Sequence, residues 1–170
     1  MNDKFLLLLD GMTGSGKTSV TKLLAERLPR TAIIGMDKVK RFVTDFERGK
    51  RDNQIAKAVI FEMAKKYLEL GLSVIVDQPL KDEEIFQYGK LAEDLSVKCY
   101  KIQLYSSSEV SFNRVKERQK NLVNKVPEDR ILKNISFFKD RSHLGFFVID
   151  TSNLSIEKVS NLILKEIMGK

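Results

Sequence analysis

The chain has 170 residues, of which 42% are hydrophobic and 31% charged, a balance that excludes a disordered chain and favours one globular domain. Its net charge of +7 favours anionic ligands such as phosphates or nucleic acid, although a need for solubility explains the charge equally well. One cysteine, Cys99, excludes an intrachain disulfide, and no apolar run approaches the ~20 residues that span a bilayer, so we expect a cytoplasmic protein without membrane contacts.

The predicted elements alternate between strands and helices along the chain. The strands are short apolar runs bounded by turn residues, and the helices are stretches in which apolar side chains recur every three or four positions. Ile55, Val59 and Met63, for example, have the spacing of one helix face. We expect strands at 5–9, 31–35, 72–76, 97–104 and 146–149 and, beyond a helix that opens at Lys17, helices at 53–70, 83–95, 108–120, 128–139 and 156–167.

This alternation predicts the α/β class, with a five-stranded parallel sheet covered by helices on both faces in three α/β/α layers. We expect residues 1–170 to form a single domain. In such folds ligands bind at the carboxyl ends of the strands. The residues that directly follow the predicted strands are therefore the candidates for function.

A glycine-rich loop follows the first strand. Residues 11–18 read GMTGSGKT and complete the pattern G-x-x-x-x-G-K-[ST], in which backbone N–H groups and a helix N-terminus converge on phosphate oxygens. Lys17 supplies a cation for the β- and γ-phosphates, and Thr18 supplies a hydroxyl ligand for Mg²⁺. The sequence predicts a nucleoside triphosphate site formed by Gly11, Thr13, Gly14, Ser15, Gly16, Lys17, Thr18 and Ser19.

Other interpretations of this loop are weaker. Gly14-Ser15-Gly16 also begins a dinucleotide fingerprint with Asp37 at the distance of a ribose-binding acid, but Ser19 stands where that fingerprint has Gly or Ala. A helix-capping glycine turn is the purely structural alternative. The nearest approach to a guanine-reading Asn-Lys-x-Asp motif is residues 124–127, NKVP, which lacks the aspartate. ATP is therefore favoured over GTP by default.

Acidic residues follow the second and third strands. Asp37 could take the proton of an acceptor hydroxyl near Mg²⁺, or it could cap a helix that begins at Lys38. Arg41, one helical turn further, could bind an anionic acceptor or form a solvated ion pair. Asp77 closes the run LSVIVD and is predicted to hold Mg²⁺ or its waters, with a turn aspartate before Pro79 as the alternative.

Two arginines lie four positions apart on the predicted helix 108–120. Arg114 and Arg118 share one helix face, and their guanidinium groups could neutralise charge on a transferring phosphoryl group. A helical lid over about residues 114–127 would carry them and exclude water. An ordinary basic helix with a solvated face is the alternative.

Together these features resemble the P-loop kinases, and most closely the group of polynucleotide kinases, zeta toxins and small-molecule kinases. The resemblance rests on the loop 11–18, on Asp37 with Arg41 behind it, on VIVD, and on R-x-x-x-R ahead of Val126-Pro127. It covers nearly the whole chain. Two departures concern the acceptor side: Lys40 stands where the phage polynucleotide kinase has an arginine, and the gap between the two arginines and Val126-Pro127 is longer.

The resemblance implies a role for several residues. It implies ATP as the phosphoryl donor, Mg²⁺ as the metal, and Asp37 as the base for the acceptor hydroxyl. Arg114 and Arg118 would clamp the phosphates as lid arginines. The turn after the last strand, with Thr151, Ser152 and Asn153, would lie against the adenine.

The sequence therefore predicts a kinase that moves the γ-phosphoryl group of ATP to a hydroxyl of a small molecule or nucleotide. A polynucleotide 5′-hydroxyl kinase is the second interpretation, because an electropositive path to Asp37 would suit a polyanion. An ATP-binding switch or ATPase that acts through a partner is the third. The sequence carries no signal for an oligomeric state. The electropositive path to Asp37 would be formed by the basic side chains of Lys38, Lys40, Arg41, Arg48, Lys50 and Arg51. Phe42 and Phe46, which lie beside these residues in the sequence, are expected to face the core.

Overall fold

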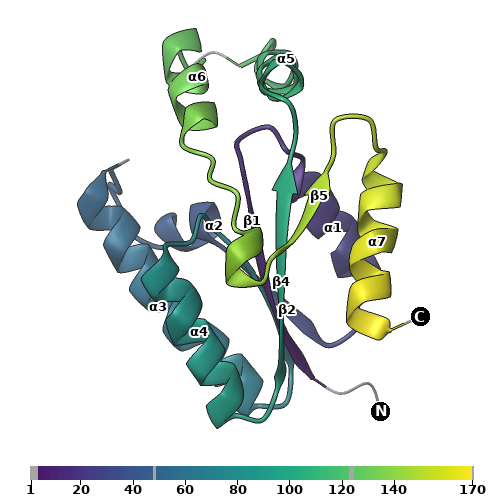
Figure 1. Ribbon diagram of the computed structural model, residues 1–170. Helices are drawn as coiled ribbons and strands as arrows, with labels where there is room; N and C mark the ends of the chain where they lie inside the picture. The colour runs from purple at the N-terminus through teal and green to yellow at the C-terminus, as the bar shows by residue number, and fades with distance from the viewer. Residues whose placement is uncertain (1–3, 48, 123–124, 170) are drawn as a thin grey trace. The chain divides into compact units, whose positions relative to one another are not determined.

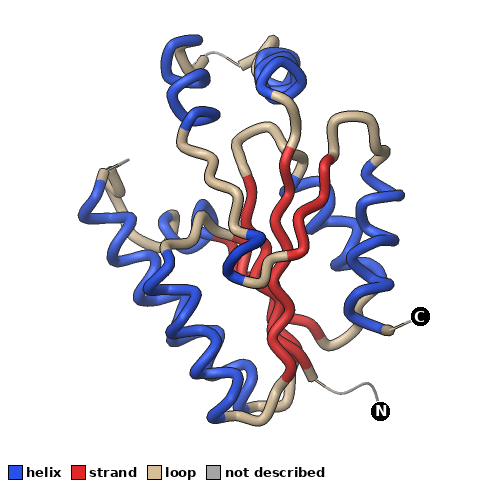
Figure 2. Tube along the Cα trace, viewed as in Figure 1, coloured by secondary structure: helices blue, strands red, loops and turns tan. Residues whose placement is uncertain are grey.

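The computed structural model describes residues 4–47, 49–122 and 125–169, and it has the predicted α/β class. Five parallel strands form one sheet in the order β2-β3-β1-β4-β5, within a three-layer α/β/α arrangement (Figures 1 and 2). Each predicted strand is present, with ends that differ by one or two residues. The strands are β1 (Phe5–Gly11), β2 (Thr31–Gly35), β3 (Ser73–Asp77), β4 (Lys98–Tyr105) and β5 (Phe147–Asp150).

Helices connect these strands in the predicted positions. They are α1 (Lys17–Arg27), α2 (Met36–Lys40), α3 (Lys50–Glu69), α4 (Asp82–Asp94), α5 (Ser108–Arg118), α6 (Glu128–Ser136) and α7 (Ile156–Met168), with a short 3₁₀ turn at Ser142–Leu144. The chain divides into two compact units, one of residues 4–9 and 25–100 and the other of residues 10–24 and 101–169. The expectation of one domain over 1–170 stays a prediction.

The first unit contains β2, β3 and the start of β1. The apolar run of β1 is buried throughout, and β3 pairs with it and with β2, so that Asp77 lies beside both Leu9 and Gly35. The chain segments that leave β2 and β3 therefore start from the same edge of the sheet. One helix face was predicted wrongly: α3 buries Ala56, Ile60, Ala64 and Leu68, whereas Ile55 and Val59 are 42% and 41% exposed. The prediction followed the large apolar residues, but the small alanines let the helix approach the sheet closely.

The second unit contains the glycine-rich loop, β4, β5 and the helices α1, α5, α6 and α7. β4 and β5 pair in parallel from Ile102 opposite Phe147 to Tyr105 opposite Asp150. Ser155 caps α7 by accepting a hydrogen bond from the Lys158 N–H, as the sequence predicted. A small core joins the loop to the two helices of the predicted lid: Met12 packs with Val115 of α5 and with Ile131 and Ile135 of α6.

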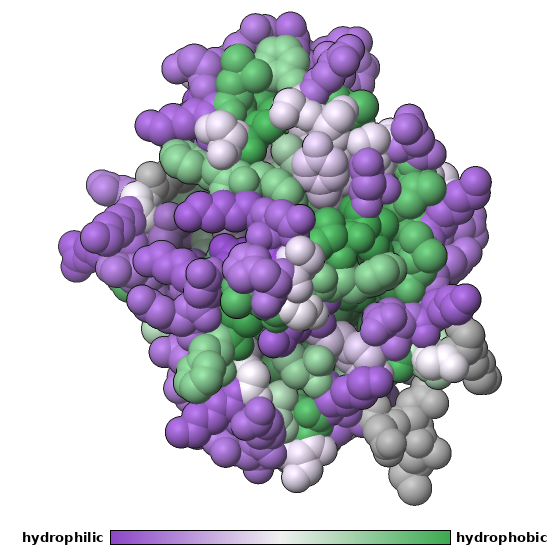
Figure 3. Space-filling view, in the orientation of Figure 1, coloured by the Kyte–Doolittle hydropathy of each residue, from purple (hydrophilic) through white to green (hydrophobic). Residues whose placement is uncertain are grey.

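Polar and charged side chains cover much of the visible surface, with smaller apolar areas between them (Figure 3). In the part of the chain that the structure describes, no helix combines the length and the apolar character that a membrane span requires.

Candidate functional site

The glycine-rich loop between β1 and α1 adopts backbone conformations that favour glycine. Gly14 and Gly16 have φ angles of +83° and +93°. A Cβ atom on Gly14 would lie 2.5 Å from the carbonyl oxygen of Ser111, whereas one on Gly16 would meet nothing within 4 Å. Gly14 therefore allows the loop to pass against α5, and Gly16 leaves the space beside the loop open.

The backbone of this loop presents hydrogen-bond donors for which the described part of the chain supplies no acceptor. Among the described residues, the N–H groups of Thr13, Gly14 and Gly16 donate to no protein acceptor, although that of Ser15 donates to the Met12 carbonyl at 3.2 Å. The Ser15 hydroxyl is buried and likewise has no partner in the described chain. Free backbone N–H groups within one short loop can form a concave anion site, so the loop fits a phosphate chain.

Lys17 and the residues after it lie at the start of α1. The Lys17 ammonium folds back over the loop, with Nζ 2.6 Å from the Gly11 carbonyl oxygen and 3.2 Å from that of Met12. Thr18 and Ser19, in the first turn of the helix, are exposed. The structure therefore brings together the cation, the hydroxyl groups and the positive end of α1 beside the free N–H groups.

The turn after β5 holds this loop in place. Thr151 is buried, and its Oγ1 lies 3.0 Å from the Ser15 carbonyl oxygen and 2.9 Å from that of Tyr105. The Arg114 guanidinium donates to the Thr151 carbonyl at 2.7 Å and to its Oγ1 at 3.1 Å, and it reaches the Gly14 carbonyl at 3.5 Å. Arg114 thus braces the loop through Thr151. Its predicted contact with phosphates stays a prediction.

Ser152 fixes the same turn. Its hydroxyl accepts a hydrogen bond from the Ser107 N–H at 2.9 Å and donates to Asp150 Oδ1 at 2.6 Å, and its N–H donates to the same oxygen at 2.8 Å. The hydrogen bonds from the Ser152 hydroxyl and N–H lower the pKa of Asp150. The side chains of Thr151 and Ser152 are therefore engaged by the protein, and their predicted contact with adenine stays a prediction.

The second predicted arginine lies at the end of α5. Arg118 is exposed, and its side chain forms no hydrogen bond or ion pair with any described residue, in contrast to that of Arg114. The neighbouring Gln119 is buried, and its side-chain amide pairs with the Val126 backbone through bonds of 3.1 and 2.9 Å. These bonds tie together the two ends of the segment between α5 and α6. Residues 123 and 124 of the predicted lid lie outside the described residues.

A buried polar network directly before the loop was missed in the sequence. Asp10 Oδ2 lies 3.1 Å from Arg141 Nε and accepts a hydrogen bond from Gln103 Nε2 at 3.1 Å. The same Nε2 donates to the Lys139 carbonyl at 3.0 Å, and Gln103 Oε1 accepts from the Arg141 N–H at 3.0 Å. An acid that ends an apolar run was the only signal in the sequence, because its partners lie more than ninety residues further along the chain.

The acidic candidates belong to the first unit. Asp37 lies exposed in the first turn of α2, but it does not cap this helix, which begins one residue earlier and has Gly35 before it. Arg41 directly follows α2 and is exposed, and no ion pair joins it to Asp37 among the described residues. Asp77 is the half-buried last residue of β3. Asp77 therefore ends β3, and Asp37 lies two residues after β2, the strand that pairs with β3.

The basic residues near Asp37 are mostly solvated. Lys38, Lys50 and Arg51 are exposed and Lys40 is half-buried, whereas Arg48 lies outside the described residues. The exposed side chains are free to reach an anion, but exposure is also the ordinary state of charged residues on a surface.

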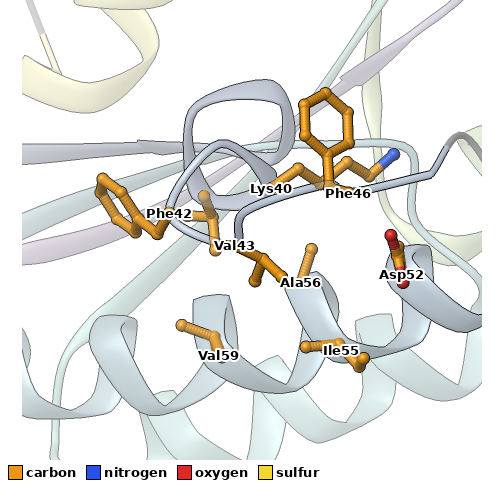
Figure 4. Close-up of a pocket in the computed structure, with 9 residues that line it drawn as sticks. Lys40, Phe42, Val43, Phe46, Asp52, Ile55, Ala56 and Val59 are labelled. Atoms are coloured by element: carbon orange, nitrogen blue, oxygen red, sulfur yellow. The ribbon is translucent and has the colours of Figure 1, made fainter.

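An apolar pocket lies between α2 with the segment that follows it and α3 (Figure 4). Phe42 is 73% exposed, so the expectation that it faces the core is wrong, and Phe46 is half-buried at the pocket. The pocket volume is about 70 Å³, which corresponds to about two water molecules. Its apolar walls are formed by Val39, Phe42, Val43 and Phe46 on one side and by Ile55, Ala56 and Val59 of α3 on the other.

The comparisons with known proteins agree with this geometry. The family model that matches the chain, described as an AAA domain, covers residues 6–140. No curated protein matches the chain in sequence. The chain is similar in structure to the APS kinase of Mycobacterium tuberculosis, solved with AMPPNP and APS, with 15% identity, a TM-score of 0.68 and 100% of both chains covered.

It is also similar to a gluconokinase from Sinorhizobium meliloti, with 17% identity, a TM-score of 0.67, and 99% of this chain and 94% of that chain covered. A chain of an RNA repair complex matches with 14% identity and a TM-score of 0.66, over 80% of this chain and 44% of that chain. Such identities establish a shared fold. The chain therefore belongs to the AAA domain family and has the kinase-like P-loop fold that its sequence resembles.

Proposed function

We propose that this protein is a kinase that transfers the γ-phosphoryl group of ATP to a hydroxyl group of a small molecule or nucleotide. The observation that carries the proposal is the loop between β1 and α1, where three backbone N–H groups are unused and the Lys17 ammonium lies over the loop. These groups would bind the phosphates and neutralise charge that builds up during transfer.

In the proposed reaction the acceptor oxygen forms a bond to the γ-phosphorus, and the bond from that phosphorus to the β,γ-bridging oxygen breaks. ADP leaves, and Asp37 takes the proton of the acceptor hydroxyl. The Thr18 hydroxyl and the Asp77 carboxylate would be the protein ligands of Mg²⁺, which prefers oxygen atoms of this type. When bound, Mg²⁺ would neutralise phosphate charge. Arg118, which is exposed and unpaired within the described chain, is free to approach the phosphates.

An ATPase or switch would need the same loop, so the fate of the phosphoryl group separates the two functions. We would incubate the protein with Mg²⁺, ATP labelled in the γ-phosphate, and panels of sugars, nucleosides, nucleotides and 5′-hydroxyl oligonucleotides. The proposal expects label on at least one acceptor. Label in inorganic phosphate alone, released faster when another protein is added, would establish the switch instead.

Lys17→Ala should weaken ATP binding and remove this transfer, because the phosphates would lose the cation that the loop itself supplies. The matched control is Lys22→Ala, an exposed lysine of the same helix, which should leave both unchanged. ATP affinity is measured by calorimetry and transfer by the labelled product. Equal ATP affinity of Lys17→Ala and the wild type would contradict the role of the loop.

A polynucleotide acceptor has one specific observation in its favour, namely the exposed side chains of Lys38, Arg41, Lys50 and Arg51 in the first unit. A polyanion bound there would be labelled less as salt rises, because each phosphate contact releases counterions. Loss of labelling in the variant Arg48/Lys50/Arg51→Ala would support this acceptor. No labelling of a 5′-hydroxyl oligonucleotide by the wild type at any salt concentration would remove it.

A further inference from the structure

Met12 is a buried apolar residue inside the glycine-rich loop. Its side chain is 5% exposed, while the neighbouring Thr13 is half-buried. The pattern G-x-x-x-x-G-K-[ST] leaves this position open, because the loop binds phosphates there through backbone N–H groups and not through side chains. A large apolar side chain at residue 12 therefore needs an explanation beyond phosphate binding.

The side chain of Met12 belongs to the small core beneath α5 and α6. It packs with Val115 of α5 and with Ile131 and Ile135 of α6, and Met12 is the one described member of this core that comes from the loop. A methionine side chain is unbranched and adapts its shape to the side chains around it. The core therefore joins α6 to the loop through this one side chain.

The backbone of Met12 is part of the phosphate-binding arrangement. Its N–H donates to the Leu104 carbonyl at 3.2 Å, and the Ser106 N–H donates to its sulfur atom at 3.3 Å. Its carbonyl oxygen accepts hydrogen bonds from the Ser15 N–H and from the Lys17 ammonium, both at 3.2 Å. A displacement of Met12 would therefore also displace the cation that the loop supplies for phosphates.

Helix α6 depends on the same core for its place in the fold. It has only nine residues, and a helix of this length is marginal in water without tertiary packing. Its buried residues Ile131 and Ile135 lie four positions apart, on the face that packs against Met12. The ion pair between Lys116 of α5 and Glu128 of α6, at 2.8 Å, is exposed and adds little. Apolar packing therefore determines how α6 and the loop sit against each other.

We propose that Met12 is a positioning residue, through which Ile131 and Ile135 of α6 hold the phosphate-binding groups of the loop in place. A close-packed core passes a change in one side chain on to its neighbours. Loss of volume at Ile131 would leave Met12 without part of its wall. The Ser15 N–H and the Lys17 ammonium, which bond to the Met12 carbonyl, would then lose their fixed positions. The inference rests on the ATP site of the proposed function and not on transfer to an acceptor.

The test measures ATP affinity by calorimetry in the presence of Mg²⁺, with the full chain. Ile131→Ala should weaken ATP binding about fivefold, although Ile131 is placed in the core and not at the phosphates. The matched control is Ile163→Ala, an equally buried isoleucine of α7 outside this core, which should keep its affinity within about twofold of the wild type. Urea denaturation should show a loss of stability in both variants. If either alanine variant unfolds, Ile131→Val and Ile163→Val form a milder pair, for which we expect the same order of affinities. An unchanged ATP affinity in the Ile131 variant, or an equal loss in the Ile163 variant, would overturn the proposal.

A double-mutant cycle tests the path through Met12. Met12→Ala should weaken ATP binding about as much as Ile131→Ala, and Met12→Leu, which nearly keeps the volume, should restore most of the affinity. The double variant Met12→Ala/Ile131→Ala should bind ATP no more than about twofold more weakly than the weaker single variant, because both changes act on one contact. Losses that multiply in the double variant would overturn the path while leaving the kinase proposal intact. A wild-type protein that binds no ATP would instead remove the proposed function and this inference together.

Discussion

The proposed reaction needs two regions, the glycine-rich loop of residues 11–18 (the phosphate loop) and the segment after β2, and they are built differently. The loop is held from several sides: the Gly14 carbonyl is reached by Arg114 and the Ser15 carbonyl by Thr151. The segment after β2 is a helix of five residues followed by an exposed chain, in which Asp37 and Arg41 face solvent. A donor phosphate is the same in every ATP kinase and fits a rigid site, whereas acceptors differ and require a surface that can vary.

The largest loss of stability is expected when Asp10, directly before the loop, is replaced. Asp10→Ala removes one partner of a buried ion pair, so the free energy of unfolding should fall by about 3 kcal/mol. Asp37→Ala, in the exposed segment, should change it by less than about 1 kcal/mol, the size of a helix-terminus effect. Urea denaturation measures both. Equal losses would refute the contrast between a braced loop and a solvated segment.

Alanine substitutions at Gly14 and Gly16 distinguish the cost of backbone strain in the loop from the cost of a steric clash. Both have positive φ, so an alanine at either position should cost about 1–2 kcal/mol of stability. Gly14→Ala should cost roughly 1 kcal/mol more, because its Cβ atom would collide with the Ser111 carbonyl while that of Gly16→Ala meets open space. The comparison is again made by urea denaturation. A larger loss in Gly16→Ala would show that α5 doesn't restrain the loop.

Substitutions of the two arginines of α5 should lower the free energy of unfolding by less than the glycine substitutions do. Arg114→Lys loses the paired contacts with Thr151 and should lower the free energy of unfolding by about 1 kcal/mol. Arg118→Lys should leave it unchanged within about 0.3 kcal/mol, because that side chain is exposed. Thermal unfolding without nucleotide measures both variants. A loss in Arg118→Lys equal to that in Arg114→Lys would contradict the distinct positions of the two side chains.

The strands and the loop could be predicted because their signals are local. An apolar run, a glycine pattern and a helix cap such as Ser155 each lie within a few neighbouring residues, and the structure confirms them. The buried face of α3 could not be predicted in this way, because Ala56 and Ala64 are weakly hydrophobic and are chosen for their small volume. Local spacing assigned Arg114 and Arg118 to one face, yet it could not reveal that Thr151 binds only the first.

Contacts between distant residues account for most of what the sequence left out. Asp10 meets Gln103 and Arg141 only because β1, β4 and the segment before β5 come together in the fold. Gln78 and Tyr88 are ten residues apart and carry no motif, yet the fold buries both. Groups of this kind are therefore found from burial and contacts in the fold rather than from spacing.

The measurement that tests the central claim most directly is acceptor-dependent label transfer by Asp37→Asn, at saturating ATP and with the acceptor that the panel identifies. If Asp37 takes the acceptor proton, transfer should fall about a hundredfold or more, because a general base contributes that factor or a larger one. ATP affinity, measured in parallel by calorimetry, should stay within about threefold of the wild type, because the phosphate loop is intact. Transfer at the wild-type rate by Asp37→Asn would contradict the account.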